Sequence, residues 1–389
     1  MSTFLGFIEE IPGISVDRFD GENLDSSAYF LSHCHTDHMH GLNDEFFAHL
    51  QRFNKYLYCS RISKDFLSNV YPENCIKDIA FNKRVYVEYR NKNGAADVLF
   101  VTCIYAGHCL GSMMFLFEKA DKLILYTGDF RINPADFPNL APLHFRSGSE
   151  LLPKKLTKIY LDTTFLDPNF ATFPTRTDVI TTMCNVIKQW LAQGPRNVVI
   201  LECSATYGSE FLFMELSKFF RKPIHVKSNV YPNYCHIPDL KYHVTIDQNA
   251  TPIHACMSKK ECLYLKGLKC CPDIFKKNIL TIVPSTFKWK GKDTSVIGAW
   301  DNVRKRTFNL CYSMHSSFNE LKAFIQYFNP EKIFPCVCPD GLEHKIYYLL
   351  EEIKRKPKEE KKDIVKDNEK YILQVLKHKD IDKSWADDY

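Results

Sequence analysis

The 389-residue sequence has no apolar run close to the roughly 20 residues that a membrane-spanning helix needs, and it has no internal repeat. It also lacks the apolar core of a secretory signal, because Glu9, Glu10 and Pro12 interrupt its first segment. Without an export signal, the 15 cysteines, an odd number, are expected to be reduced thiols in the cytosol or nucleus, a few of them bound to metal. We therefore expect a soluble protein with no membrane partner.

The sequence is also poor in net charge. Lysine and arginine together number 51, and aspartate and glutamate 46, which gives a formal net charge of +5. This mildly basic balance permits a nucleic-acid partner without arguing for one. The composition, 45% hydrophobic and 25% charged, is that of an ordinary globular protein, and the length is sufficient for two domains.

The first third of the chain contains short apolar runs that predict strands, at residues 98–105, 123–126 and 159–161. Each run is followed closely by a residue that can bind a metal or move a proton: His108, Asp129 and Asp162. Reactive side chains just beyond strand ends indicate a layered α/β fold.

The middle of the chain alternates between helical and strand patterns. Apolar residues recur at helical spacing over residues 179–191, a buried strand is expected at 197–201, and a second helix at 209–220. This alternation predicts a separate α/β lobe that begins near residue 160. From about Lys354, lysine, glutamate and aspartate dominate, which predicts a flexible charged tail with one weak helix at 371–376. Residues 354–362 fit a nuclear-import signal and an ordinary charged cluster equally well.

Four potential metal ligands lie within six residues: His33, His35, Asp37 and His38. From an extended loop, His33 and His35 can point to one metal, and the two following ligands can turn to a second metal. The competing interpretations are a single structural zinc site and a solvated turn. A closed structural zinc more often uses cysteine thiolates, so we favour an open site with two metals.

The order His-x-His-x-Asp-His, Gly-His and Gly-Asp resembles the ligand set of the metallo-β-lactamase superfamily. Further motifs are similar to the β-CASP nucleases of this superfamily, and most of all to their Artemis-like DNA-processing branch. These motifs are Ser-Val-Asp-Arg-Phe at 15–19, Tyr-Phe-Leu-Ser-His-Cys-His at 29–35, Met-Phe-Leu-Phe at 114–117, Leu-Tyr-Thr-Gly-Asp-Phe-Arg at 125–131, Tyr-Leu-Asp-Thr-Thr-Phe at 160–165, Ile-His-Ala-Cys at 253–256 and His-Ser-Ser at 315–317. The resemblance covers roughly residues 1 to 350.

The resemblance implies an αββα sandwich interrupted by an inserted α/β domain of the β-CASP type. The expected division is a first part of the metallo-β-lactamase domain at 1–157, the β-CASP domain at 158–309, the returning part of the sandwich at 310–352, and the flexible tail at 353–389. A bound substrate is expected to lie in a groove between the two domains.

The resemblance also implies a role for each residue of the site. The first metal would be held by His33, His35 and His108, and the second by Asp37 and His38, with Asp129 between them. Asp162 and Asp17 would orient metal-bound histidines, and His315 would contact the phosphate or supply a proton. The alternatives are that Asp162 caps a turn and that Asp17 and His315 are structural. Glu210 matches less tightly, and we interpret it as a packing or capping residue.

A second metal site is expected in the inserted domain. His254 and Cys256 have the spacing of a chelating hairpin, and the resemblance implies that His225 and Cys270 complete a structural zinc site, with Cys271 as the alternative to Cys270. The other interpretation is that these are ordinary buried thiols.

Several positions depart from the family or bear on its substrate. Val337 stands where RNA-processing members carry a further histidine, which favours the DNA-processing branch. Thr36 and His40 replace lysines of close relatives and weaken the expected grip on phosphate, and Leu110 replaces a proline. Candidate DNA contacts are Arg131 and the clusters at 287–292 and 304–306, although an ordinary solvated face is the simpler interpretation of both clusters.

The expected function is that of a nuclear, zinc-dependent DNA nuclease. It would act as a 5′–3′ exonuclease, a structure-specific endonuclease or both, including hairpin opening, on DNA ends, overhangs or hairpins in double-strand-break or crosslink repair. One or two Zn²⁺ are expected in the active site and one in the structural site, and Mg²⁺ or Mn²⁺ could replace the second active-site ion. The alternatives are an RNA endonuclease, a small-molecule hydrolase such as a thioesterase or lactamase, and a metal-free scaffold that binds DNA.

Overall fold

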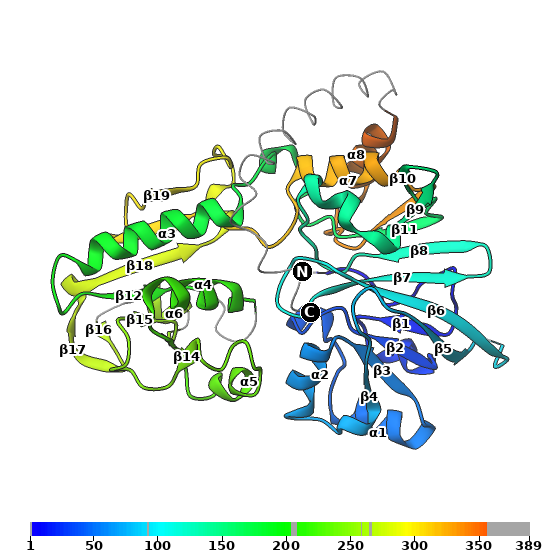
Figure 1. Cartoon of the computed structure of the whole chain (residues 1–389), viewed down its shortest axis with the longest axis horizontal. Coiled ribbons are helices and arrows are strands. Elements are labelled where there is room, and N and C mark those ends of the chain that lie inside the picture. Colours follow the sequence, from blue (N-terminus) through cyan, green and yellow to red (C-terminus); the bar gives the residue numbers. More distant parts are fainter. Residues whose placement is uncertain (1, 92, 204–207, 258, 264–266, 356–389) are drawn as a thin grey trace.

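The computed structural model (Figure 1) describes residues 2–91, 93–203, 208–257, 259–263 and 267–355. The predicted helix at 371–376 lies outside the described residues. Most of the charged tail and of the cluster at 354–362 does so too. Among the described helices, none combines the length and the apolar character that a bilayer span requires.

The first sheet is a parallel four-stranded sheet near the N-terminus. Its strands, in order, are β1 (Ile14–Val16), β2 (Ala28–Phe30), β3 (Tyr56–Cys59) and β4 (Ile76–Asp78). Two capped helices cover its outer face: α1 (Asp44–Phe53), whose N-cap Asn43 accepts from Phe46 N, and α2 (Arg61–Ser68), whose N-cap Ser60 accepts from Ser63 N. Their apolar residues Phe46, Leu50 and Phe66 pack in one core with Tyr29 and Leu57 of the sheet.

The second sheet has six strands in the order β21-β11-β8-β7-β6-β5. The strands are β5 (Arg84–Arg90), β6 (Ala96–Tyr105), β7 (Met113–Lys119), β8 (Lys122–Tyr126), β11 (Lys158–Leu161) and β21 (Lys332–Pro335). The four strands from β5 to β8 are antiparallel, and β8, β11 and β21 are parallel. Both faces of β7 are buried, because Phe115 packs toward the first sheet and Leu116 toward the helices α7 (Phe318–Phe328) and α8 (Glu343–Arg355).

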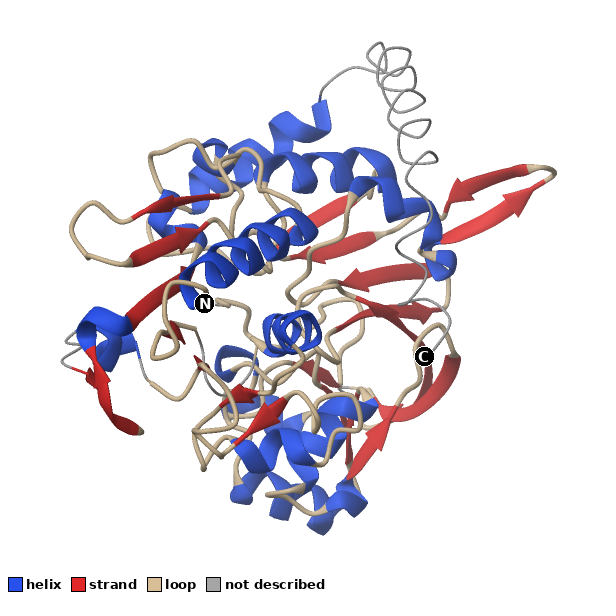
Figure 2. Ribbon diagram, turned by 60° about the vertical axis from the view of Figure 1, so that its left-hand side comes forward, coloured by secondary structure: helices blue, strands red, loops and turns tan. Residues whose placement is uncertain are grey.

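Figure 1 shows the resulting layers, with α7 and α8 above the two sheets and α1 and α2 below them. In the rotated view of Figure 2, helices again lie above and below the strands. Residues Val16 and Phe30 of the first sheet share a core with Phe115 and Tyr126 of the second. The αββα sandwich expected from the sequence is therefore confirmed.

A second α/β body is inserted in the sequence between the first and the returning part of the sandwich. Its seven-stranded sheet has the order β14-β13-β15-β12-β18-β20-β19, and only β19 is antiparallel to its neighbour. The strands are β12 (Val198–Leu201), β13 (Ile224–His225), β14 (Val244–Thr245), β15 (Ile253–His254), β18 (Ile279–Pro284), β19 (Gly298–Trp300) and β20 (Thr307–Leu310). The helices α3 (Arg176–Leu191) and α4 (Glu210–Phe220) bury apolar faces in its core.

We call this body the inserted lobe, from α3 to β20. It contacts the sandwich at Phe66 of α2, whose ring centroid lies 6.3 Å from that of Tyr234 in α5 (Tyr231–Cys235) of the lobe. The domain boundaries at residues 158 and 310 remain predictions. Strand β11, which opens the predicted inserted domain, pairs with β8 and β21 inside the six-stranded sheet.

Candidate metal centre

The candidate ligands lie in loops that follow the ends of β2, β6, β8 and β11, so that one edge of the sandwich collects them. Asp17 anchors the first loop. It has a φ of 56°, which is uncommon outside glycine, and its carboxylate accepts from Ser32 N at 2.7 Å and from Ser32 Oγ at 2.5 Å. Ser32 Oγ in turn lies 3.0 Å from His33 Nδ1. This chain of contacts fixes the His-x-His loop and leaves His33 Nε2 turned toward Asp129.

His33, His35 and His108 converge as the sequence predicts. His35 Nδ1 lies 3.0 Å from His108 Nε2, and the ligand atoms of these three residues and Cys109 all lie within 4.8 Å of one another. The other ring nitrogen of His108 donates to the carbonyl of Met314 at 3.0 Å, which fixes the orientation of this imidazole.

Burial keeps these imidazoles neutral. It lowers the pKa of His33 and His108 well below the usual value, with further lowering by neighbouring histidines, and it lowers the pKa of His35 to about 4. A neutral imidazole, which has a free electron pair on one ring nitrogen, is the form in which histidine binds a metal.

His38 and Asp129 form the second part of the centre. Asp129 Oδ1 lies 3.2 Å from His38 Nε2, and Asp129 Oδ2 lies 3.7 Å from Nε2 of both His33 and His108. The two oxygens of one carboxylate thus face two different sets of imidazoles. His38 Nδ1 lies 2.7 Å from Asp17 Oδ2, which also accepts from Tyr126 OH at 2.8 Å.

His38 and Asp129 stabilise each other in their charged forms. Burial alone would lower the pKa of His38, but Asp129 and Asp17 raise it well above the usual value. Burial opposes ionisation of Asp129, yet His38, His315 and His108 hold its pKa well below the usual range. The centre therefore contains a buried carboxylate in its charged form.

Two buried nitrogens test whether a cation fits here. His33 Nε2 and His38 Nε2 have no hydrogen-bond partner among the described residues, although both face Asp129. Buried polar atoms without partners require an explanation, and a metal ion bound between imidazoles and a carboxylate would supply one. The residues present fit a metal site.

Asp37 is the one predicted ligand that the structure does not bring into these groups. Its Oδ2 accepts from the backbone N–H of Ser2 at 3.0 Å, and no closely spaced group of candidate ligands in the described chain includes it. The N-terminal segment is held there because Thr3 N donates to the carbonyl of Cys336 at 2.9 Å. Burial dominates the pKa of His35 and lowers it, and the nearby Asp37 opposes part of this lowering.

Asp162 and His315 form a pair at the side of the centre. Asp162 Oδ2 lies 2.8 Å from His315 Nδ1, and His315 Nε2 lies 3.9 Å from Asp129 Oδ2. Burial lowers the pKa of His315, but Asp162 and Asp129 together raise it above the usual value. The histidine that Asp162 holds is therefore His315, whereas Asp17 holds the candidate ligand His38. Asp162 also caps a turn, since its Oδ1 accepts from Thr164 N at 2.9 Å.

Val337 lies beside this pair. Its backbone exchanges two hydrogen bonds with Thr163 Oγ1, at 2.5 and 3.2 Å, next to Asp162. An aliphatic side chain offers no ligand atom at this place.

A second group of candidate ligands lies in the inserted lobe. His225 and His254 are register partners on adjacent strands, and their Nδ1 atoms lie 2.9 Å apart. Cys270 Sγ lies 3.6 Å from both Cys256 Sγ and His254 Nδ1. All four ligand atoms fall within 4.8 Å of one another, and Cys271 is not in the group. Two imidazoles and two thiols at this spacing suit a closed tetrahedral site.

Sequence reasoning missed one residue of the centre, Cys109, and three hydrogen bonds that hold the centre in place. Cys109 directly follows His108 and could have been found from that position. The others, Ser2 N to Asp37, Tyr126 OH to Asp17 and the Met314 carbonyl to His108, join residues far apart in the sequence, and two of them use backbone atoms, which no residue type reveals. Glu210 behaves as a capping residue, since both its oxygens accept from Gly208 N.

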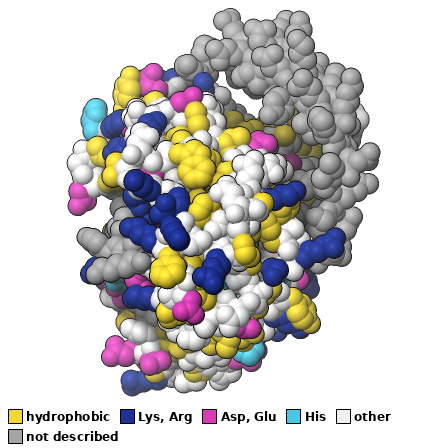
Figure 3. Space-filling model, turned by 90° about the vertical axis from the view of Figure 1, so that its left-hand side faces the viewer, with side chains coloured by type: hydrophobic (Ala, Val, Ile, Leu, Met, Phe, Trp, Pro, Cys, Tyr) yellow, Lys and Arg dark blue, Asp and Glu magenta, His cyan; other side chains and the backbone are white. Residues whose placement is uncertain are grey.

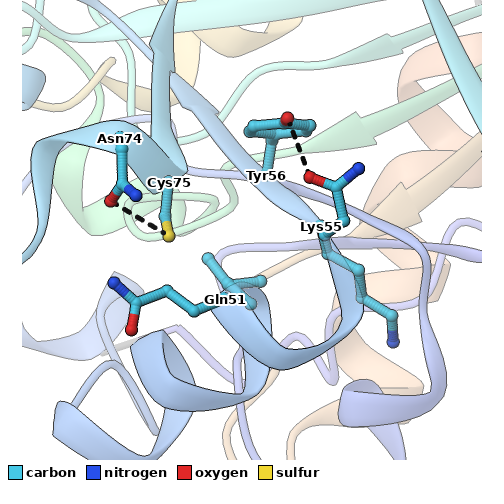
Figure 4. Close-up of a pocket in the computed structure, with 7 residues that line it drawn as sticks. Gln51, Lys55, Tyr56, Asn74 and Cys75 are labelled. Carbon is cyan, nitrogen blue, oxygen red and sulfur yellow. Dashed lines mark hydrogen bonds between the residues drawn. The ribbon is translucent and has the colours of Figure 1, made fainter.

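A cavity of about 370 Å³ lies elsewhere, between α1, β3 and the turn at Glu73–Cys75 (Figure 4). Its lining residues are Leu50, Gln51, Asn54, Lys55, Tyr56, Asn74 and Cys75. Tyr56 OH donates to Asn54 Oδ1 at 3.0 Å within it. None of these residues belongs to either group of candidate ligands, so the cavity is separate from the metal centre.

Comparisons with known proteins identify relatives of this chain. The family model described as DNA repair metallo-beta-lactamase matches residues 238–341. The chain is 38% identical over 353 residues to "Protein artemis" of Danio rerio, covering 88% of the chain and 54% of that protein. It is 36% identical over 353 residues to "Protein artemis" of Homo sapiens, covering 88% and 50%. It is 28% identical over 347 residues to "DNA cross-link repair 1A protein" of Mus musculus, covering 85% and 31%. The chain spans about half the length of the Artemis relatives that it matches.

Proposed function

The chain belongs to the Artemis-like branch of the DNA repair metallo-β-lactamase family, and from this premise we propose that it is a metal-dependent nuclease that hydrolyses DNA phosphodiester bonds. One observation carries the proposal. The two oxygens of Asp129 face separate sets of imidazoles, His38 on one side and His33 with His108 on the other. Asp129 would therefore be able to hold two cations, one with each oxygen.

The proposed metal is Zn²⁺, because histidine nitrogens and carboxylates are its usual ligands in hydrolytic sites. His33, His35 and His108 would hold the first ion, His38 the second, and Asp129 both. Asp37 remains a proposed ligand of the second ion, although here its carboxylate binds the Ser2 amide. When bound, the ions would supply Lewis acidity toward the phosphate and lower the pKa of a water. Mg²⁺ or Mn²⁺ could serve at the second position.

The surrounding residues prepare the centre for this reaction. Asp17 holds Nδ1 of His38, so that Nε2 faces Asp129. Asp162 holds Nδ1 of His315, so that its Nε2 faces the centre as a proton donor. The raised pKa of His315 favours the protonated ring, which suits contact with a phosphate and donation of a proton to the departing oxygen.

DNA is favoured over RNA as the substrate because Val337 lacks the further ligand of the RNA-processing members. Phe287 is 69% exposed and packs on Phe165 at 5.6 Å between ring centroids, and Phe165 lies 5.9 Å from the ring of His315. A base could stack on Phe287 near the scissile phosphate, with Lys290 exposed beside it. Lys288 is exposed too, with its Nζ 4.0 Å from Asp301 Oδ2. Figure 3, seen from the side of the inserted lobe, has Lys and Arg side chains gathered beside hydrophobic ones.

Three residues that the sequence suggested as DNA contacts, Trp289, Arg131 and Arg304, are not available to DNA in this structure. Trp289 is buried at 5% exposure and offers no stacking face. Arg131 pairs with Glu320, and Arg304 pairs with Glu202 at 2.8 Å, so that both cations are already committed. Of the cluster at 304–306, only Lys305 is exposed, and the two arginines are half-buried.

The finer parts of the proposal concern biology and the second site. We assign a structural Zn²⁺ to His225, His254, Cys256 and Cys270. We propose action in the nucleus on DNA ends, overhangs or hairpins, as a 5′–3′ exonuclease, a structure-specific endonuclease or both, during double-strand-break or crosslink repair. The names of the relatives support repair, and the closed ligand group supports the zinc.

The test is cleavage of 5′-labelled single-stranded, blunt and hairpin DNA and of matched RNA strands, with bound metal measured on the same protein. Metal-dependent cleavage of DNA in preference to RNA is the expected result. Preference for RNA would favour the RNA endonuclease. Bound metal with activity only on a small thioester would favour the small-molecule hydrolase, and DNA binding by a metal-free protein would favour the scaffold.

A further inference from the structure

Arg131 is a buried arginine two residues beyond Asp129, at the point where the metal centre meets the inserted lobe. Its side chain is 8% exposed, and its backbone N–H donates to the carbonyl of Ala106 at 3.0 Å. The guanidinium is therefore carried by a loop that also carries the central carboxylate. A buried cation of this kind needs a hydrogen-bond acceptor for each of its donor groups.

Those acceptors lie on both connections of the inserted lobe. The chain leaves the sandwich through residues 173–175, which lead into α3, and it returns through residues 311–316, which follow β20. Arg131 Nη2 donates to the carbonyls of Pro174 at 3.0 Å and Phe173 at 3.4 Å, on the outgoing connection. Arg131 Nη1 donates to the carbonyl of Ser313 at 3.0 Å, on the returning connection. The side chain of Arg131 thus makes hydrogen bonds to both connections between the sandwich and the inserted lobe.

Glu320 balances the charge. Its Oε1 lies 3.2 Å from both Nε and Nη2 of Arg131, and its Oε2 accepts from Ser317 N at 2.6 Å in the capping box of α7. A buried ion pair is weak evidence of added stability, because desolvation offsets the attraction, but it can fix one arrangement of segments. The planar guanidinium reaches four acceptor residues, which a lysine ammonium cannot match.

The returning connection carries parts of the candidate site. Ser313 Oγ contacts the backbone of His315, and Ser316 N donates to the carbonyl of Phe130 at 2.9 Å. The Met314 carbonyl between them accepts from His108. A second arginine makes the reverse contact, from the inserted lobe to the sandwich. Arg176, the first residue of α3, donates to the carbonyl of Gly107, which precedes His108. Through these hydrogen bonds, the two arginines join the inserted lobe to the loops that carry the candidate ligands.

We propose that Arg131 is a positioning residue that fixes both connections of the inserted lobe to the Asp129 loop and so sets how the two lobes are held beside the candidate metal centre, where a nucleic-acid strand would bind. The proposal rests on the proposed nuclease function for its substrate. Arg131 itself touches neither the strand nor a metal. Its effect is therefore on substrates long enough to contact both lobes, and small on a substrate that reaches the metal centre alone.

The test compares Arg131→Lys with the matched control Arg146→Lys, which changes an exposed arginine of strand β9 (His144–Ser147). Steady-state rates are measured on a single-stranded DNA and on bis(4-nitrophenyl) phosphate, with metal content measured in parallel. We expect Arg131→Lys to lower kcat/KM for DNA by about tenfold or more, through KM, and to change the small diester less than about twofold, with metal content retained. An equal loss on both substrates, a loss of metal, or no loss would overturn the proposal.

A second measurement does not depend on catalysis. Amide hydrogen exchange in Arg131→Lys should be faster over residues 173–178 and 311–317 than in Arg146→Lys, and unchanged in α1. If wild type cleaves neither substrate, the nuclease proposal fails, and unchanged exchange would separately refute the positioning role. If Arg131→Lys does not fold, Glu320→Gln removes the charge of the partner while keeping an acceptor for Ser317 N, and the same exchange pattern is expected.

Discussion

His38 Nδ1 lies 2.7 Å from Asp17 Oδ2, and this contact leaves His38 Nε2 facing Asp129 at 3.2 Å. Asp17 also accepts from Ser32 and from Tyr126 OH, so one buried carboxylate joins the ligand loop to β8. Carboxylates that hold the outer nitrogen of a metal-binding histidine fix its tautomer and orientation. The geometry of the proposed second metal position therefore depends on a residue that is not itself a candidate ligand.

Asp17→Asn should weaken the second metal position without unfolding the chain. An amide keeps the shape of the carboxylate but loses the charge that orients His38, and we expect metal affinity at that position or cleavage to fall about 10- to 100-fold. Metal titration followed by mass spectrometry of bound ions measures the effect. Asp25→Asn, at an exposed position, is the control. Full occupancy of both positions in Asp17→Asn would show that His38 needs no such partner.

Asp37→Asn tests the predicted ligand that the structure leaves outside the group of candidate ligands. If Asp37 turns from the Ser2 amide to the second ion when metal binds, the variant should lose DNA cleavage on the order of 100-fold while remaining folded. Thermal unfolding and cleavage are compared with those of Asp44→Asn, an exposed position in the first turn of α1. A variant that cuts as fast as wild type would remove Asp37 from the site and leave it as an anchor for the N-terminal segment.

The cluster of candidate ligands was predictable because its residue types are concentrated in short motifs just beyond strand ends. His33, His35 and His38 lie in one loop, and His108 and Asp129 follow recognisable apolar strands. A fold in which neighbouring strands end at the same edge brings such motifs together without further information.

The remaining contacts depend on tertiary packing. Trp289 looks like a stacking residue in the sequence, yet it is buried against Phe173 and Cys311 in a small core. Arg131 looks available for phosphate, yet its guanidinium is occupied by carbonyls of segments 42 or more residues away. Backbone acceptors carry no residue-type signature, so the commitment of a side chain to them cannot be derived from a sequence.

Cleavage should depend on pH through His315. The carboxylates of Asp162 and Asp129 raise its pKa despite burial, so the protonated ring persists to higher pH than in a free histidine, and cleavage that needs this proton falls as pH rises through the raised value. The ion pair between His315 and Asp162 also contributes to the free energy of unfolding. This contribution is complete below the pKa that His315 has in the unfolded chain, and it is lost as pH rises through its raised pKa in the folded protein.

Asp162→Asn removes the carboxylate nearest to His315, at 2.8 Å, and should move the alkaline fall in cleavage rate to lower pH. Rate profiles over neutral and alkaline pH are recorded beside those of Asp121→Asn, an exposed aspartate in the turn between β7 and β8. An unchanged alkaline limb in Asp162→Asn would mean that His315 does not act through its proton.

The inserted lobe should lose a metal when Cys270 is replaced but not when Cys271 is. Cys270 Sγ lies 3.6 Å from both Cys256 Sγ and His254 Nδ1, whereas Cys271 lies outside the ligand group although it is the next residue. Because a structural zinc adds its binding free energy to folding, Cys270→Ser should lose one equivalent of zinc and unfold roughly 5 °C or more below wild type, while Cys271→Ser keeps both properties. Zinc content and thermal unfolding of the two variants, prepared side by side, measure the difference. Equal zinc content in the two serine variants would show that Cys270 is an ordinary thiol, and a loss confined to Cys271→Ser would reassign the fourth ligand to its neighbour.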